Sequence, residues 1–244
     1  MATPRMSYII ASTMRTGSYL LCEALEWTRR AGYPREIFCP ERRGMYEGEW
    51  QLPKGTSLEE FLRTAIERGT SANGVFGTKI HFHHVEPLAR EAQFTGEAVQ
   101  VLRKIFPDAK YVHLRRRDRR AQAISWYRAK VTNEWWRIRG LTQPDLTGRV
   151  PEFHAPEIRR REFELERQQQ AWDRFFAETP VESIVMDYEV LAANYREEVA
   201  RALVFIGEDP ALALKLPEPR LVVQADGTTE EWRRKMDAMF PGSP

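Results

Sequence analysis

Four short apolar runs recur along the chain, and segments with helical spacing separate them. These runs predict strands at residues 7–12, 74–82, 110–115 and 181–186. Strands that alternate with helices predict a parallel sheet covered on both faces, and therefore an α/β fold. Ligands of such sheets bind at the carboxyl ends of the strands. We therefore expect Ser12, His81, Arg115 and Met186 to lie at the ligand-binding edge.

The segments between the strands carry helix signals and two long loops. Helices are predicted at residues 17–30, 57–68, 97–106, 118–136, 157–179, 188–206 and from 229 onward. Ser57 begins a capping box with Glu60, and Asp118 is a suitable N-cap. The segment 35–53, with its Pro, Gly and many charges, is predicted to be mostly loop, and the segment 140–156 a loop or lid, within a single domain spanning 1–244. Residues 221–224 are predicted to form a short strand or an extended arm.

Composition narrows the class of protein. The 244 residues are 42% hydrophobic and 30% charged, as in an ordinary globular protein with a sizeable core. No apolar run approaches the roughly 20 residues of a membrane span, and the N-terminus has no signal-peptide core. We expect a cytoplasmic protein without a membrane span, in which Cys22 and Cys39 are reduced. The formal net charge of +2 does not describe a polycation.

The stretch Ser12-Thr13-Met14-Arg15-Thr16-Gly17-Ser18 joins the first strand to its helix. Its small residues let the backbone curl around an anion, helix-terminal amides point outward, and Arg15 adds a charge. The P-loop of ATP-binding proteins has a Lys directly after its second Gly, and here Ser18 follows Gly17. The pattern predicts an anion site of another kind; the alternative is an ordinary helix cap made by Ser and Thr.

A second basic element follows the third strand. Residues 115–120 contain five arginines, and 115–117 lie between the strand and the helix cap at Asp118. Ser125 lies two turns into the helix, on the same side as Asp118. An arginine at the strand end together with Ser125 would suit a second phosphate group. Arg119 and Arg120 are expected on a solvated face of the helix.

Five motifs in this order resemble the bacterial sulfotransferases that use 3′-phosphoadenosine-5′-phosphosulfate (PAPS), of the trehalose 2-sulfotransferase type. The loop 12–18 resembles the family's S-x-R-[ST]-G-S with one extra residue at Thr13-Met14, and Arg116 with Ser125 resembles its 3′-phosphate element. The other three are Gly32-Tyr33-Pro34-Arg35-Glu36-Ile37-Phe38, Asn73-Gly74-Val75-Phe76-Gly77-Thr78-Lys79, and Gln224-Ala225-Asp226 followed by Glu231-Trp232. The resemblance spans nearly the whole chain.

The resemblance implies a P-loop-like sulfotransferase fold, a homodimer, and sulfuryl transfer from PAPS to a hydroxyl of a carbohydrate or glycolipid such as trehalose, leaving PAP and using no metal. It implies that Glu36 is the general base and that Arg15 and Lys79 act near the transferred group. The implied donor-binding residues are Ser12, Thr13, Met14, Arg15, Thr16, Gly17, Ser18, Arg116, Ser125 and Gln224. His81, His83 and Trp135 are assigned to the acceptor side.

Alternatives remain open for several of these residues. Apart from the resemblance, Glu36 is typical of a surface carboxylate, and Lys79 has equal reason to pair with an acid. His81, His83 and His113 are rival bases because imidazole has a suitable pKa. Trp126 is expected to pack in the core or in a dimer interface. Trp135 and Trp136 are candidates for either the pocket or the interface.

Two other functions compete with sulfuryl transfer. The first is an ATP-dependent small-molecule kinase with a variant P-loop, for which Asp187 is the one candidate magnesium ligand at a strand end. The second is a nucleic-acid-binding protein that uses the run 115–120. The modest net charge and the interspersed acidic residues argue against the second.

Overall fold

The computed structural model describes residues 3–140, 150–221 and 226–241 and is organised around a parallel sheet. The strands are β1 (Met6–Ser12), β2 (Val75–His81), β3 (Lys110–Arg115) and β4 (Ser183–Asp187). Their spatial order is β2-β1-β3-β4, and every neighbouring pair is parallel. All four predicted strands are confirmed, with boundaries that shift by at most a few residues. Ser12 pairs with His81, and Arg115 pairs with Asp187, so the carboxyl ends are level.

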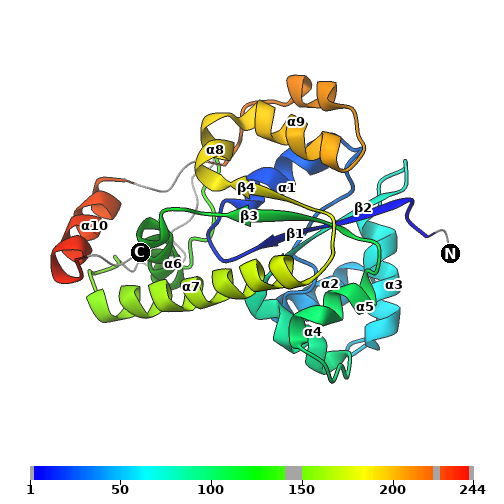
Figure 1. The fold of residues 1–244 in the computed structure, drawn as a ribbon, viewed down its shortest axis with the longest axis horizontal. Coiled ribbons are helices and arrows are strands. Elements are labelled where there is room, and N and C mark those ends of the chain that lie inside the picture. Colours follow the sequence, from blue (N-terminus) through cyan, green and yellow to red (C-terminus); the bar gives the residue numbers. More distant parts are fainter. Residues whose placement is uncertain (1–2, 141–149, 222–225, 242–244) are drawn as a thin grey trace.

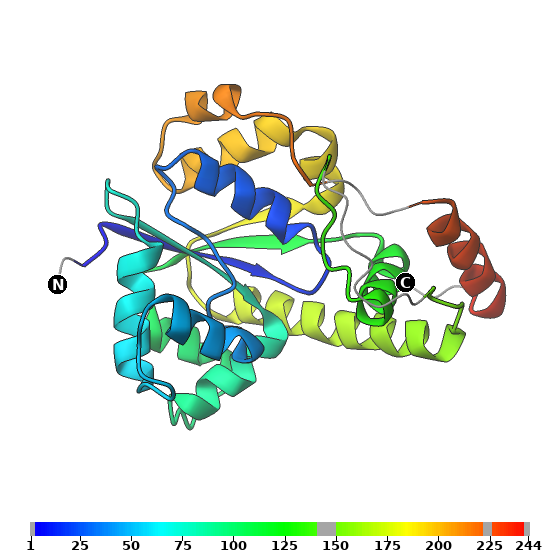
Figure 2. The ribbon, with the colours of Figure 1, turned by 180° about the vertical axis from the view of Figure 1, so that it is seen from behind.

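Alternate residues of β1 face opposite layers of helices, which is why the strand is apolar from Tyr8 to Ala11. Tyr8 and Ile10 join the core under α1 (Ser18–Trp27), α8 (Tyr188–Ala193) and α9 (Tyr195–Phe205). Ile9 and Ala11 join the core on the other face. That face is covered by the long α7 (Ala155–Glu178) together with the segment from α2 (Arg43–Glu49) to α5 (Val101–Ile105) (Figures 1 and 2). The predicted fold class, a central parallel sheet flanked by helices, is confirmed.

Among the remaining helices and turns of the described residues, those that were predicted begin and end within a few residues of the predicted bounds, and five of the eleven were not predicted. They are η1 (Pro40–Arg42), α2 (Arg43–Glu49), α3 (Leu58–Gly69), η2 (Phe82–His84), α4 (Val85–Glu91), η3 (Ala98–Gln100), α5 (Val101–Ile105), α6 (Arg119–Thr132), α7 (Ala155–Glu178), η4 (Pro210–Lys215) and α10 (Gly227–Met239). Both predicted caps are present: Ser57 Oγ accepts from the Glu60 amide over 3.2 Å, and Asp118 accepts from the Ala121 amide over 2.9 Å.

Two local predictions are wrong. The segment 35–53 is not mostly loop, because η1 and α2 occupy residues 40–49; Tyr46 of α2 packs against Trp50, and Trp50 against Phe61 of α3. Packing against distant aromatic rings therefore outweighs the Gly and charged residues that favour a loop. The predicted helix 188–206 is two helices, since the chain breaks at Asn194.

Arg119 and Arg120 are buried, so their predicted place on a solvated face is also wrong. Arg120 Nε lies 2.7 Å from Glu162 Oε1, and the same guanidinium pairs with Asp237 of α10. Arg119 lies 3.4 Å from Glu166. The glutamates come from α7, which packs along α6 from more than 40 residues away in the sequence. The sequence of α6 alone does not indicate that acidic residues of α7 pair with its arginines.

The order of the strands creates a crevice between β1 and β3. Within the sheet, β2 lies on one side of β1 and β3 lies on the other, so the chain crosses over β1 between β2 and β3. The loops that follow β1 and β3 therefore diverge, and ligands of open α/β sheets bind at such a point. The two predicted anion-binding elements, residues 12–18 and 115–118, are these two loops.

Some predictions concern residues that the structure does not describe. Most of the predicted loop or lid 140–156 and most of the arm 221–224, including Gln224, lie outside the described residues. Within the described part, Leu221 forms an isolated bridge with Ile138, and α10 begins at Gly227. Among the described helices, none is both long enough and apolar enough to cross a membrane.

Candidate active site

The loop between β1 and α1 turns sharply because two of its residues have left-handed backbone conformations. The φ angle of Arg15 is 62° and that of Gly17 is 72°. A Cβ atom on Gly17 would clash with the ring of Tyr188, so the loop needs glycine here for its backbone and for its space. The Thr16 hydroxyl donates to the Thr13 carbonyl over 2.9 Å and closes the turn. The fold thus presents the start of α1 to the crevice.

Gln122 of α6 holds this loop in place. Its side chain is fully buried, and Nε2 donates to Thr13 Oγ1 over 2.9 Å and to the Met14 carbonyl over 2.5 Å. Its Oε1 accepts from Arg119 over 2.7 Å. Thr13 and Met14 are where the loop is one residue longer than the motif it resembles. The extra residue is therefore accommodated by two hydrogen bonds from a buried amide.

Two arginines from different strand ends meet beside the loop. Arg15 Nε donates to Ser125 Oγ over 3.0 Å, and Arg116 donates to the Arg15 carbonyl over 3.1 Å. The Arg116 guanidinium lies 4.7 Å from the centroid of the Tyr188 ring. Its Nε is buried and has no hydrogen-bond partner among the described residues. Burial, followed by the charge of Arg116, lowers the pKa of Arg15 to about 10. Two like charges this close favour the binding of an anion.

Glu36 is the centre of a second cluster, at the end of β2. The segment after α1 runs beside this strand, where the Arg35 carbonyl accepts from the Lys79 amide over 3.0 Å. This pairing carries Glu36 under the sheet edge, and its carboxylate is only 8% exposed. Glu36 Oε2 lies 2.7 Å from Lys79 Nζ and accepts from the Tyr19 hydroxyl over 3.3 Å. Glu36 is therefore a buried carboxylate and not the surface group that its sequence position suggests.

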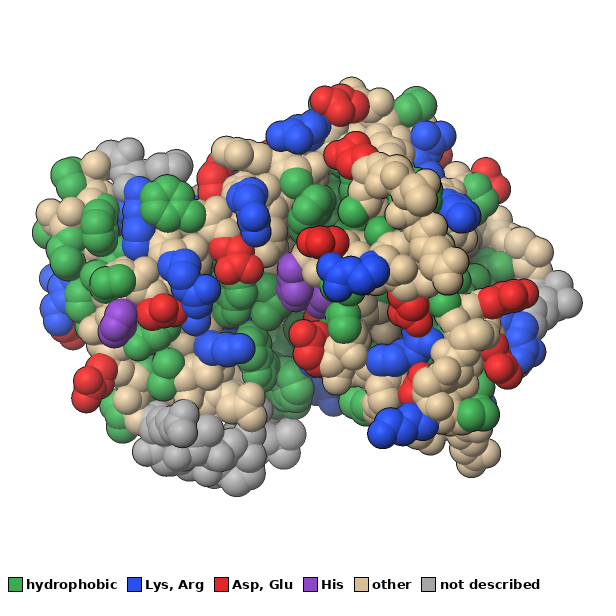
Figure 3. All heavy atoms as spheres, turned by 90° about the horizontal axis from the view of Figure 1, so that it is seen from below, with side chains coloured by type: hydrophobic (Ala, Val, Ile, Leu, Met, Phe, Trp, Pro, Cys, Tyr) green, Lys and Arg blue, Asp and Glu red, His purple; other side chains and the backbone are tan. Residues whose placement is uncertain are grey.

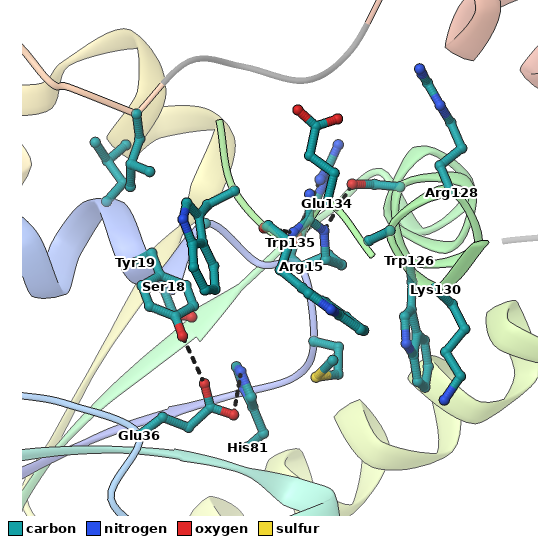
Figure 4. Close-up of a pocket in the computed structure, with 18 of the residues that line it drawn as sticks. Arg15, Ser18, Tyr19, Glu36, His81, Trp126, Arg128, Lys130, Glu134 and Trp135 are labelled. Carbon is teal, nitrogen blue, oxygen red and sulfur yellow. Dashed lines mark hydrogen bonds and ion pairs between the residues drawn. The ribbon is translucent and has the colours of Figure 1, made fainter. Parts of the chain in front are cut away.

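The other carboxylate oxygen faces histidines. Glu36 Oε1 lies 3.4 Å from Nε2 of His84 and 3.8 Å from Nε2 of His81. The ring of His81 is also held by Ser12, whose Oγ is 2.9 Å from Nδ1. Figure 4 shows Tyr19, Glu36 and His81 pointing toward one another at the floor of the pocket. The carboxylate is thus held at Oε2, whereas Oε1 faces two imidazole rings.

Charge in this cluster keeps Glu36 ionised. Burial alone would raise the pKa of its carboxyl group, but the Lys79 ammonium outweighs burial and lowers the pKa far below its usual value. Burial lowers the pKa of His81 well below its usual range and that of His84 to about 3. The pKa of Lys79 is raised despite its burial, because Glu36 stabilises the ammonium. At neutral pH the cluster is an ion pair with neutral imidazoles.

One cavity of about 560 Å³ joins the arginines to the carboxylate. Its walls carry Trp126, Trp135 and Trp136, the last 5.8 Å from Tyr19 between ring centroids. In Figure 4, Glu36 lies on one side of the pocket, Trp126 and Lys130 lie on the other, and Arg15 and Trp135 lie between them. Figure 3 shows histidine side chains near the middle of one face, flanked by acidic and basic side chains. The cavity thus combines charged groups at its ends with aromatic walls.

Most of the predicted site residues meet at this cavity. Its lining includes Met14, Arg15, Gly17, Ser18, Glu36, His81, His83, Arg116, Ser125 and Trp135. Ser12, at the end of β1, and Thr13 and Thr16, in the loop, are buried and do not line the cavity. Lys79 is 1% exposed and pairs with Glu36. Of the two predicted possibilities for Lys79, the structure therefore has the one in which it pairs with an acid. Tyr19, His84 and Gln122 contact these residues and were not predicted; Tyr19 follows the anion loop directly, which was the one available signal.

Two residues named in the alternatives lie elsewhere. The ring of His113 is 2.8 Å from Gln169 Nε2 and stacks on Phe176 of α7, outside the cavity lining. Asp187 pairs with Arg115 over 3.2 Å and with Arg117 over 2.9 Å. Asp187 is therefore engaged in ion pairs and does not face the arginines of the crevice. The same pairs, with those of Arg119 and Arg120, neutralise much of the basic run 115–120.

Comparison with known proteins identifies the family. The Stf0 sulphotransferase model matches residues 7–238. The chain belongs to the Stf0 sulphotransferase family. The trehalose 2-sulfotransferase of Mycolicibacterium smegmatis is 30% identical over 270 residues, covering 98% of this chain and 97% of that protein. The trehalose 2-sulfotransferase of Mycobacterium tuberculosis is 31% identical over 264 residues, covering 96% and 95%. The predicted resemblance is confirmed, and the chain is a sulfotransferase.

Two solved structures that match nearly the whole chain have low sequence identity to this sulfotransferase. A crystal structure of retinol dehydratase in complex with androsterone and inactive cofactor PAP is 13% identical, with a TM-score of 0.43, covering 97% of this chain and 81% of that one. The sulfotransferase domain of the Synechococcus PCC 7002 olefin synthase is 15% identical, with a TM-score of 0.42, covering 100% and 97%.

Proposed function

We propose that this sulfotransferase uses PAPS as its donor, transfers the sulfuryl group to a hydroxyl of a carbohydrate or glycolipid, and releases PAP. The observation that carries the proposal is that one cavity has an arginine pair at one end and a buried, ionised carboxylate at the other. The first suits a polyanionic donor and the second a proton acceptor. The relatives named trehalose 2-sulfotransferase make trehalose the first acceptor to test.

The residues at the arginine end fit a donor with two anionic groups. The buried Nε of Arg116 has no hydrogen-bond partner among the described residues, and the left-handed turn at Gly17 leaves the first amides of α1 toward the crevice. The loop 12–18, with Arg15 and Ser18, would hold the 5′-phosphosulfate. Arg116 and Ser125 would hold the 3′-phosphate, which favours PAPS over ordinary nucleotides. A role for Gln224 stays a prediction.

Glu36 is the proposed general base. The bound donor supplies an electrophilic sulfur attached to a phosphate leaving group, and the acceptor oxygen attacks that sulfur in line. The hydroxyl proton becomes strongly acidic as the new bond forms, so a carboxylate of lowered pKa suffices to take it late in the reaction. General bases contribute about 10²–10⁴-fold to rates. Lys79 and Tyr19 hold Glu36 Oε2, and this leaves Oε1 for the incoming proton.

The acceptor would lie between Glu36 and the aromatic walls. His81 and His83 line the cavity beside Glu36, and Trp135 and Trp136 supply flat apolar surfaces of the kind on which sugar rings stack. His81 is neutral and bonded to Ser12, so it is suited to orient a hydroxyl by hydrogen bonding. The homodimer, the single domain over 1–244, the cytoplasmic location and the lack of a metal requirement stay predictions.

A screen with ³⁵S-labelled PAPS tests the proposed function. The purified protein is incubated with a panel of hydroxylated acceptors that begins with trehalose and glycolipids, and sulfated products are separated and counted. We expect label to move to a carbohydrate hydroxyl and PAP to form in equal amount. Transfer of phosphate from labelled ATP to the same panel, without sulfated product, would replace the proposal by the kinase alternative.

A further inference from the structure

The side chains around Glu36 include a cysteine and a histidine with no role in the proposed reaction. A donor atom from each of Glu36, Cys39 and His84 lies within 4.8 Å of the other two, and all three residues are buried. They come from the segment after α1 and from η2, which the sheet edge brings together. A carboxylate, a thiol and an imidazole are a set of ligands typical of zinc.

The state of His84 indicates that one member of this cluster lacks a partner. The side chain is 1% exposed, yet neither ring nitrogen has a hydrogen-bond partner among the described residues. Its Nε2 lies 3.4 Å from Glu36 Oε1, a contact that does not have the geometry of a hydrogen bond. Buried polar atoms are seldom left unsatisfied. A cation between the ring and the carboxylate would satisfy both.

The two oxygens of Glu36 are used differently, and this leaves room for a cation. Oε2 is held by Lys79 and Tyr19, whereas Oε1 faces His84. Zinc bonds of about 2.0–2.3 Å place tetrahedral ligand atoms roughly 3.3–3.8 Å apart, so the three groups need to move inward by about 1 Å at most. A solvent molecule from the cavity would complete four-coordination.

We propose that Glu36, Cys39 and His84 form a binding site for Zn²⁺ or a similar thiophilic divalent cation, and that occupation of this site blocks the sulfotransferase. Binding needs Cys39 to give up to solvent the thiol proton that it otherwise donates to Glu41 over 3.1 Å, and to bond to the metal as thiolate; no electron is transferred. The bound cation occupies Glu36 Oε1, so the carboxylate is no longer available as a base. The block rests on the proposed function of Glu36, whereas metal binding does not.

Binding is tested with the metal alone on the metal-free, full-length protein in chelator-free buffer. Calorimetric titration with Zn²⁺ should show one site, and Co²⁺ should produce a thiolate-to-cobalt charge-transfer absorption. Cys39→Ser should abolish that absorption and weaken Zn²⁺ binding by at least roughly 10–100-fold. Cys22→Ser, at the other buried cysteine, should leave both signals intact. A wild-type protein that takes up no Zn²⁺, or Co²⁺ bound without thiolate absorption, would overturn the site; the second readout needs no variant.

Inhibition is tested separately. Zn²⁺ should reduce turnover in proportion to site occupancy while the dissociation constant for PAP stays unchanged, because the arginine end holds none of the three ligands. His84→Gln should shift the inhibition to higher Zn²⁺ concentration. If the metal binds through the thiolate but turnover is unchanged, the metal site stands and the role of Glu36 as the base is refuted. A loss of PAP binding with Zn²⁺ would instead place the metal at the donor end and overturn the proposal.

Discussion

The two ends of the cavity are built on opposite electrostatic plans. At the donor end, Arg15 and Arg116 lie together, and burial with mutual repulsion lowers the pKa of Arg15. At the other end, Glu36 and Lys79 neutralise each other 2.7 Å apart, and the nearby imidazoles are uncharged. The positive charge at the donor end is thus available to an anionic ligand, whereas at the carboxylate end the charges of Glu36 and Lys79 already balance. Binding of the donor and proton transfer should therefore respond to different substitutions.

The largest effect is expected from Glu36→Gln. The variant keeps the size of the side chain and removes the basic carboxylate, so turnover should fall by about 10²–10⁴-fold while PAP affinity stays close to that of the wild type. Steady-state kinetics and calorimetry measure the two quantities. Near-normal turnover would move the base to His81 or His83.

The same variant should also lose stability, because Lys79 remains buried without its counter-charge. Removing one partner of a buried pair costs about 3–5 kcal/mol in free energy of unfolding. The double variant Glu36→Gln/Lys79→Met removes the stranded charge, and we expect it to regain stability without regaining turnover. Recovery of turnover in the double variant would make Glu36 a structural residue.

Arg116→Ala tests the donor end. Loss of a charged hydrogen bond should weaken PAP binding by about 1.5–3 kcal/mol, or roughly 10–150-fold. The matched control is Arg117→Ala, one residue along, whose side chain is exposed and bonded to Asp187 over 2.9 Å. Equal losses in the two variants, measured by calorimetry, would describe a diffuse basic patch and erase the contrast between the two ends.

Gln122→Leu tests how the donor end is held in shape. The change leaves the Met14 carbonyl without the hydrogen bond from Nε2, which costs about 1–3 kcal/mol in free energy of unfolding. PAP affinity should fall as the loop relaxes. Gln170→Leu on the exposed side of α7 serves as the control for urea unfolding and calorimetry. An unchanged PAP affinity in Gln122→Leu would show that the loop keeps its shape without this amide.

The smallest effect on turnover is expected from His113→Gln, because this ring packs on Phe176 and lies outside the cavity lining. Burial, followed by Arg115, lowers the pKa of His113 from 6.5 to about 3. The unfolded chain therefore binds the extra proton between these values, so wild-type stability falls as the pH falls from about 6.5 to 3. One such histidine contributes a slope of up to about 1.4 kcal/mol per pH unit.

Urea unfolding across that pH range should show a shallower slope for His113→Gln than for the wild type. An identical slope would mean that the ring is protonated in the folded protein. A large loss of turnover would restore His113 as a rival base.

The sequence predicted the donor end better than the carboxylate end for a physical reason. Residues 12–18 and Arg116 with Ser125 form two short segments, each directly after a strand, and strand order alone brings them together. The surroundings of Glu36 come instead from α1, β2 and η2, which contribute Tyr19, Lys79 and His84. Periodicity does not reveal such contacts. The resemblance pointed to Glu36, but its burial and its partner became visible only in the fold.

The burial of Arg119 and Arg120 shows the same limit. The charged residues of α6 predict that the two arginines are exposed to solvent. They are buried because glutamates of α7, far away in the sequence, pair with them. Strands and caps, which depend on neighbouring residues, were predictable; the helix α2, which depends on aromatic packing with α3, was not.

The most direct test of the central claim is a calorimetric comparison of PAP with ADP on the wild-type protein and on Arg116→Ala. The two nucleotides both carry anionic groups on the 5′ side, and only PAP has the 3′-phosphate that Arg116 and Ser125 are proposed to hold. We expect the wild type to bind PAP at least about 10-fold more tightly than ADP, and the preference to disappear in Arg116→Ala. Equal affinity of the wild type for the two nucleotides would contradict a PAPS site at the arginine end of the cavity.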